Sequence, residues 1–160
     1  MALAEASRLG IRVEQHFDGD EFAFGGTDMH VLAPARDWHS FRPGNNDSLV
    51  LKISYGGTAA LMEGDAEGLS EGLMVSRDPA AVLLKAGHHG SKTSVTPEFL
   101  AAVHPQYAVI SVGARNPFGL PNGDVLERLD RNHVTTYRTD VHGAATFWLD
   151  GSALVVMRAF

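Results

Sequence analysis

The chain has 160 residues, of which 44% are hydrophobic and 20% are charged, and it contains no cysteine. This length fits one domain with a buried core, which we take as residues 1–160. Disulfides and thiolate metal sites are excluded, so any zinc must be held by histidine and carboxylate. The net charge of −6 argues against a broad nucleic-acid surface, although it permits a local phosphate site.

The sequence shows no membrane segment. No stretch approaches the roughly 18 apolar residues of a membrane span. The first residues carry charge where a signal peptide needs its apolar segment. The chain as given is therefore expected to be soluble.

The first 47 residues predict a helix, a strand, a hairpin and a loop, over residues 1–9, 11–17, 22–32 and 35–47. Next comes an alternating strand over 48–55, in which four apolar side chains share one face. That apolar set is Leu49, Leu51, Ile53 and Tyr55. A glycine turn then leads to a strand over 58–62, a short helix to Met74 and a buried strand over 82–86.

The second half alternates strands with helices. Thr96 and Pro97 mark a helix start, with a threonine cap and proline at the first helical position, and the helix runs to about Val103. Another helix opens at Asn122 or Gly123. Strands are expected over 108–112, 134–138, 144–149 and 153–157. This order predicts an α/β protein with a mixed sheet and flanking helices.

The most informative segment runs from Leu83 to Ser94, where a short apolar strand ends in the adjacent His88 and His89, followed by Gly90. Neighbouring residues in a regular strand point to opposite faces, but a strand end followed by glycine can bend so that both rings reach one cleft. We predict both histidines as metal ligands. The alternative is one buried, hydrogen-bonded histidine and one exposed histidine.

A second motif, Gly64-Asp65, also follows an apolar strand. Its carboxylate is predicted as a third ligand, which makes Asp65, His88 and His89 the catalytic and metal-binding set of a hydrolase. The alternative is that Asp65 caps a helix beginning at Ala66, by accepting hydrogen bonds from free backbone N–H groups.

Three residues after the histidines are predicted to bind substrate. Ser91 and Thr93 offer hydroxyl groups near a helix start, and Lys92 adds a positive charge, which suits an anionic group such as phosphate. The alternative is that Ser91, Thr93 and Ser94 only cap the next helix.

Together these motifs resemble the metallo-β-lactamase-fold domain of the ComEC type, found at the C-terminus of bacterial DNA-uptake channels and in stand-alone hydrolases. The resemblance extends from residue 11 to the C-terminus. The segments that carry it are 45–51, 64–65, 88–94, 110–113, 116–119, 125–129 and 137–140 with Gly143.

The resemblance implies a four-layer αββα sandwich whose two halves enclose two metal ions, usually Zn²⁺, with Mn²⁺ as an alternative. Asp65 would bridge the metals, and His88 and His89 would complete their ligand shells. The implied reaction is phosphodiester hydrolysis, which during DNA uptake in competence and transformation would cleave the strand that is not imported.

The chain departs from this family in two ways. It has no His-x-His-x-Asp-His motif, because its N-terminal histidines, His16, His30 and His39, are isolated. In addition, Leu120 stands where the family often has histidine. The chain therefore corresponds to the C-terminal half of the sandwich, a partial domain that lacks four ligands.

Its expected partners are the N-terminal half of the same fold and a membrane channel region, within a longer parent protein of the bacterial cell membrane. DNA or a phosphoester is the expected substrate, and the isolated chain is expected to self-associate. Two alternatives stay open: a truncated, non-catalytic remnant, and a stand-alone hydrolase of small phosphoesters. The other histidines, His104, His133 and His142, are expected to be surface or turn residues.

Overall fold

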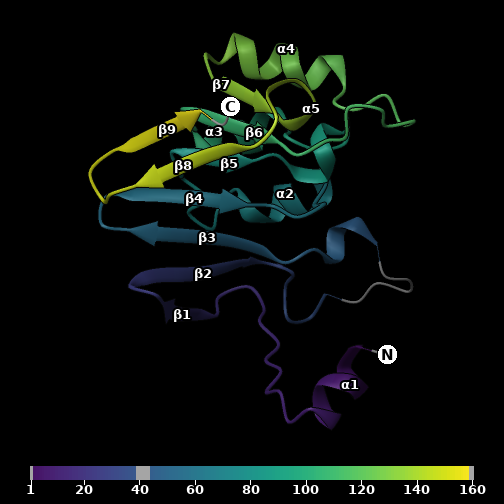
Figure 1. Ribbon diagram of the computed structural model, residues 1–160, viewed down its shortest axis with the longest axis vertical. Coiled ribbons are helices and arrows are strands. Elements are labelled where there is room, and N and C mark those ends of the chain that lie inside the picture. The colour runs from purple at the N-terminus through teal and green to yellow at the C-terminus, as the bar shows by residue number, and fades with distance from the viewer. Residues whose placement is uncertain (1, 39–43, 159–160) are drawn as a thin grey trace.

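The computed structural model describes residues 2–38 and 44–158, and its centre is a seven-stranded sheet (Figure 1). The strands lie side by side in chain order, from β1 to β7. They are β1 (Glu21–Phe24), β2 (Thr27–Ala33), β3 (Val50–Tyr55), β4 (Thr58–Met62), β5 (Leu83–Lys85), β6 (Tyr107–Ile110) and β7 (Thr135–Arg138). The predicted α/β class with a mixed sheet is confirmed.

The sheet changes direction at β4. Strands β1 to β4 pair in antiparallel fashion, whereas β4 to β7 are parallel. Two of the three antiparallel connections are tight turns, at Gly25-Gly26 and Gly56-Gly57, in which three of the four glycines have positive φ. The third, between β2 and β3, is the long segment 34–49. Each parallel connection instead requires a crossover through a helix.

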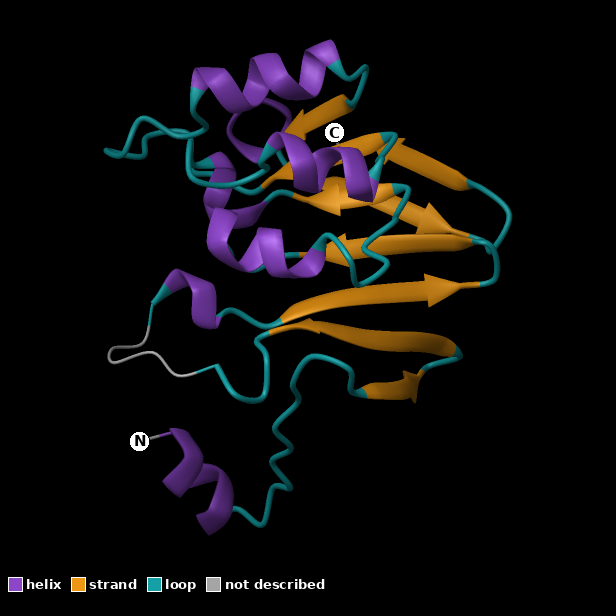
Figure 2. Ribbon diagram, turned by 180° about the vertical axis from the view of Figure 1, so that it is seen from behind, coloured by secondary structure: helices purple, strands orange, loops and turns teal. Residues whose placement is uncertain are grey.

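Three helices, α2 (Gly68–Met74), α3 (Pro97–Val103) and α4 (Gly123–Arg131), supply these crossovers and cover one face of the parallel half (Figure 2). The fully buried side chains of Leu84, Phe99 and Leu129 belong to the core between these helices and the sheet. Short helical segments complete the fold: α1 (Ala2–Arg8), α5 (Thr139–His142) and the 3₁₀ turns η1 (Asn45–Asp47) and η2 (Gly87–Gly90).

The opposite face of the parallel half is covered by a separate hairpin, β8 (Ala145–Leu149) and β9 (Leu154–Arg158) (Figure 1). Phe147 packs against Tyr107 and Tyr137, with ring centroids 6.3 and 5.4 Å apart. At the hairpin tip, the N–H of Gly57 donates to the carbonyl of Gly151 at 2.6 Å. The glycines allow this approach, because a Cβ at Gly56 would lie 2.8 Å from the Gly151 backbone.

The apolar set of β3 lies on the face away from the helices. Val50 points to the helical side and is fully buried in the core, whereas Leu49 and Tyr55 are each 46% exposed. Leu51 pairs in register with Met62, which is 40% exposed. The antiparallel half therefore presents an apolar sheet face that is partly exposed, around Tyr55 and Met62, while Val31 and Ala60 on the same face are buried.

Most predicted elements are confirmed, with ends shifted by one or two residues. The strand expected over 11–17 is wrong, because these residues pair with no strand in the part of the chain that the structure describes. Ile11 and Val13 are about half exposed, so their alternation has no sheet to pack against. Helix α5 was not predicted. The expected loop over 35–47 contains η1, and His39 lies outside the described residues.

Candidate functional site

The predicted site residues meet at the carboxyl end of the parallel strands. Asp65 follows β4, and the 3₁₀ turn η2 with both histidines follows β5. Ser111 follows β6. In open parallel sheets this end is the usual location of binding sites, because the loops that leave adjacent strands converge there.

The backbone of the histidine turn is unusual. His88 and His89 both have left-handed φ values, 42° and 55°, which cost energy in non-glycine residues and often occur at functional sites. The flanking glycines are required by close packing. A Cβ at Gly87 would lie 2.5 Å from the Ala66 carbonyl oxygen, and one at Gly90 would lie 2.8 Å from Pro121. The predicted bend is thus observed.

His88 is oriented by a carboxylate. Its Nδ1 donates to Oε1 of Glu67 at 2.9 Å, and the Nδ2 of Asn45 lies 3.3 Å from the same Nδ1. The side chain is 29% exposed. A proton on Nδ1 leaves Nε2 with a free lone pair, and this is the arrangement of most metal-binding histidines.

His89 is oriented by a backbone carbonyl. Its Nδ1 donates to the carbonyl oxygen of Ser111 at 2.6 Å, so its Nε2 also carries the lone pair. That Nε2 lies 3.6 Å from Oδ1 of Asp65, and both side chains are 46% exposed. Both histidines are partly exposed, so the alternative of one buried and one exposed histidine is wrong.

Asp65 does not cap a helix, contrary to the alternative interpretation. Helix α2 begins at Gly68, and its N-terminal N–H groups, those of Glu67 and Ser70, donate to Oδ1 of Asn46. The carboxylate of Asp65 is left to face His89. Its own N–H donates to the Ser48 hydroxyl at 3.0 Å, which joins the segment before β3 to the site.

Glu67 is a site residue that the sequence did not indicate. Burial opposes its ionisation, but hydrogen bonds from Thr93, Asn45 and His88 lower its pKa. It is therefore ionised at neutral pH and able to hold the Nδ1 proton of His88. The only sequence signal was its position two residues after Asp65, which does not distinguish it from the other acids of the chain.

The predicted substrate-binding residues lie beside this cluster. The Ser91 and Thr93 hydroxyl oxygens are 2.9 Å apart, and Thr93 also donates to Glu67 at 2.8 Å. Lys92 is exposed. Ser94 is buried and donates to the Gly87 carbonyl, which closes the loop on itself. Thr96 occupies the cap position of α3, but its side chain makes no capping hydrogen bond.

Two side chains hold the C-terminal end of the loop between β5 and α3, residues 86–96. The carboxylate of Glu71, on α2, accepts hydrogen bonds from the N–H groups of Val95 and Thr96. Arg128, on α4, donates to the Val95 carbonyl at 2.6 Å. Val95 has φ of 52°, a strained value for a β-branched residue. Both helices therefore hold one strained peptide unit in place.

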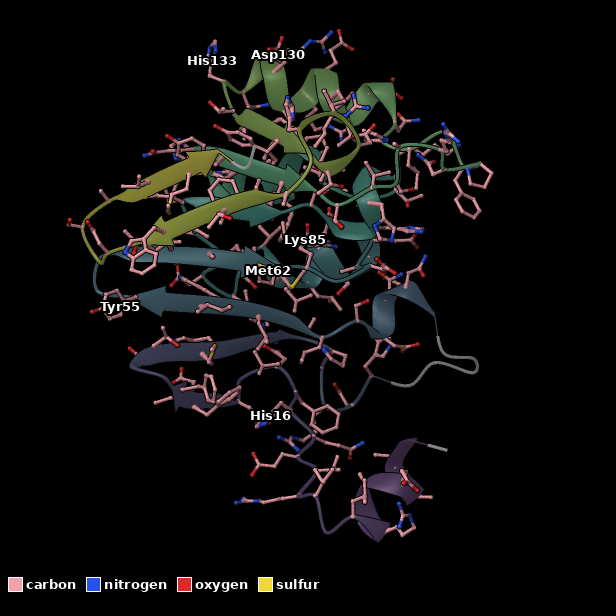
Figure 3. All side chains as sticks on the ribbon, in the orientation of Figure 1. His16, Tyr55, Met62, Lys85, Asp130 and His133 are labelled. Carbon is pink, nitrogen blue, oxygen red and sulfur yellow. The ribbon has the colours of Figure 1, made fainter. Side chains whose placement is uncertain are left out.

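Glu63 and Lys85 hold the N-terminal end of the same loop. Oε2 of the fully buried Glu63 accepts from the Gly87 N–H at 2.8 Å. Burial and the adjacent charge of Glu71 raise the pKa of Glu63 well above its usual range. Lys85 donates to the Gly64 carbonyl, which also accepts from the His88 N–H at 3.2 Å. Figure 3 shows Lys85 beside Met62, its partner across the strands.

The nitrogen and oxygen atoms of the site are of the kinds that bind a metal ion, but there are too few of them to complete its coordination. Two Nε2 atoms and one carboxylate are available, and Asp65 lies close to His89 alone. No group of three or more His, Asp or Glu side chains arranged to hold a metal is found within residues 2–38 and 44–158. His104, His133 and His142 are exposed as expected, and none lies at the site.

The chain is similar to three bacterial proteins. It is 35% identical over 147 residues to ComE operon protein 3 of Bacillus subtilis, covering 91% of this chain and 19% of that protein. Identity to Recombination protein 2 of Haemophilus influenzae is 34%, over 78% of this chain and 16% of the relative. Identity to competence protein ComA of Neisseria gonorrhoeae is 32%, over 90% of this chain and 21% of the relative.

These relatives point to the ComEC family of competence proteins. No family model matches the chain. The chain spans only about a fifth of the length of the curated ComEC-family relatives it matches. Among the helices that the structure describes, none is long and apolar enough to cross a membrane.

Proposed function

We propose that this chain supplies part of a metal-dependent site that cleaves phosphodiesters in a protein of DNA uptake. One observation carries the proposal. Both imidazoles donate their Nδ1 protons to fixed oxygens, of Glu67 and Ser111, and so keep Nε2 free to bind a metal. The Nε2 of His89 lies 3.6 Å from the carboxylate of Asp65.

In the proposed site, Asp65, His88 and His89 hold the metal, with Zn²⁺ as the expected ion and Mn²⁺ as the alternative. A metal at such a site activates water and stabilises negative charge on phosphate oxygens. The residues of this chain prepare the site: Glu67 and Ser111 orient the imidazoles. Ser91, Lys92 and Thr93, which follow the histidines, are the proposed contacts of an anionic substrate, for which Ser91 and Thr93 would exchange their present hydrogen bonds.

The remaining ligands are proposed to come from a partner segment, the N-terminal half of the same fold in a longer parent protein. The apolar sheet face of β3 and β4 supports this proposal. Tyr55 and Met62 are 46% and 40% exposed on that face, and a second sheet would bury them. Without that segment the face favours self-association. The length of the relatives leaves room for such a segment and for a channel region in the bacterial cell membrane.

Zinc binding tests the proposal. Isothermal titration of the chain with zinc should show weak binding that His89→Ala and Asp65→Ala each weaken at least about tenfold. His133→Ala, which changes an exposed histidine away from the site, is the matched control and should bind as the unchanged chain does. Equal binding by the variants and the control would exclude the site. A monodisperse monomer holding two zinc ions tightly would show that no partner segment is needed.

Activity requires the intact parent protein. The reading frame upstream of Met1 should encode a His-x-His-x-Asp-His segment, and the protein that includes it should hydrolyse single-stranded DNA. Full activity after His88→Ala and His89→Ala together would end the proposal. Hydrolysis of small phosphoesters but not DNA would favour the stand-alone hydrolase. A start site at Met1 with no zinc binding would favour the non-catalytic remnant.

A further inference from the structure

The loop between β6 and α4, residues 111–122, carries two exposed side chains that the site described above does not use. Phe118 is 80% exposed, the highest value among the large hydrophobic residues of the described chain. Arg115 is also exposed. The loop projects from the body of the molecule, beyond the carboxyl end of the sheet (Figures 1 and 2).

The loop has a defined conformation. The Nδ2 of Asn116 donates to the carbonyl oxygens of Gly113 and Leu120, both at 2.9 Å, and its Oδ1 accepts from the Leu120 N–H at 3.0 Å. One side chain thus ties the two ends of the loop together. Phe118 is therefore held at the tip of a closed loop, which lowers the entropy cost of binding to its ring.

The base of the loop joins the histidine site. A small pocket is lined by His89, Ser111, Val112, Gly113, Leu120 and Thr139. The N–H of Asn122 donates to the Gly90 carbonyl at 2.9 Å. Leu120 thus supplies an apolar side chain to the pocket that His89 lines, at the base of the loop that carries Phe118.

The charge around this pocket differs from that of the whole chain. The segments 86–97 and 111–121 contain no aspartate or glutamate, and their charged residues are Lys92 and Arg115. The chain as a whole has a net charge of −6. The carboxylates of Asp65 and Glu67 border these loops on the histidine side. The positive charge available to a polyanion is therefore that of the exposed Lys92 and Arg115.

From these observations we propose that the 111–122 loop is a platform for single-stranded DNA, a role that rests on the proposed function of the site. An unpaired base stacks on Phe118, and Arg115 and Lys92 neutralise phosphates on either side of the His89 pocket. Exposed aromatic rings flanked by basic residues bind single strands because every base has a face that can stack. A duplex keeps its bases stacked internally, so it cannot use the ring in this way.

The test measures how tightly the full chain binds a fluorescein-labelled oligothymidylate. Binding is monitored by fluorescence anisotropy at low salt in the presence of EDTA. Phe118→Ala should weaken binding about tenfold, and Phe118→Trp should preserve it. Arg115→Ala should weaken binding and reduce its salt dependence. Phe24→Ala removes another exposed phenylalanine, on β1, and is the matched control that should leave binding unchanged.

Three results would overturn the platform. The first is that the unchanged chain does not bind the oligonucleotide. The second is that the Phe118→Ala and Phe24→Ala variants bind it with equal affinity. The third is that Phe118→Ala weakens the binding of a duplex as much as that of the single strand. Phe118-dependent binding to anionic vesicles without oligonucleotide binding would assign the loop to a membrane surface instead. Because EDTA removes metal, this assay is independent of zinc. The platform can therefore stand if the metal site fails, and the metal site can stand if the platform fails.

Discussion

The parallel and antiparallel halves of the sheet differ in how they are buried. Strands β5 and β6, helices α2 to α4 and the segments that connect them supply most of the core cluster, whereas β1 to β3 contribute only Leu32, Ala33 and Val50. Every side chain of the candidate site except Asn45, Asn46 and Ser48 comes from the parallel half or its loops. The strained histidine turn is thus supported by the part of the protein that is packed on both faces.

The largest expected effect comes from the core of the parallel half. Phe99→Ala removes a fully buried ring of α3 and should lower the free energy of unfolding by about 3–5 kcal/mol. Phe24→Ala on β1, where the ring is 72% exposed, should change it by less than about 0.5 kcal/mol. Urea unfolding of both variants measures the difference. Similar losses would mean that the two halves are equally packed.

An intermediate effect is expected at the clamp on the loop. Glu71→Ala leaves the N–H groups of Val95 and Thr96 without acceptors in the interior and should cost about 1–3 kcal/mol. It should also speed hydrogen exchange at those two amides. Glu71→Gln keeps one acceptor oxygen and should cost less. Glu98→Ala, at an exposed acid in the first turn of α3, serves as the control. Unchanged exchange at Val95 would show that Arg128 alone holds the loop.

The smallest effect concerns pH. Because Glu63 has a raised pKa in the folded protein, it keeps its proton to higher pH when folded than when unfolded. Its contribution to stability is therefore full below the unfolded pKa of about 4.3 and is lost as pH rises towards the folded value. Glu63→Gln, an uncharged isostere, should flatten the stability curve above pH 4. Parallel curves for both proteins would mean that Glu63 is ionised in the fold.

The sequence predicted the elements of the parallel half well, because β4 to β6 are short apolar runs followed closely by glycine and helices α3 and α4 have their own start signals. It also placed Asp65 and His89 together, since both follow parallel neighbours in the sheet. Two features escaped prediction. Glu67 gains its role from the bend at His88 rather than from any spacing, and residues 11–17 alternate without a partner strand. Both depend on which segments meet in space.

The clamp illustrates the same limit. Glu71 reads in the sequence as an ordinary acid in the first turn of a helix. Only the packing of α2 against the loop shows that its carboxylate lies under Val95, where a β-branched residue adopts a left-handed backbone. Local sequence propensity predicts neither the burial of the Glu71 carboxyl group nor the positive φ of Val95, because tertiary contacts impose both.

The contact between Gly57 and Gly151 closes a long loop of chain. Every strand and helix of the parallel half lies between these two glycines in the sequence, and Gly151 lies near the end of the chain. Contacts so distant in sequence form slowly, because the closure of a long loop costs entropy before the contact is gained. During synthesis, β5 to β7 and the histidine turn can therefore assemble before the C-terminal hairpin arrives to cover them. The hairpin residues, which follow these elements in the chain, complete the cover over Tyr107 and Tyr137.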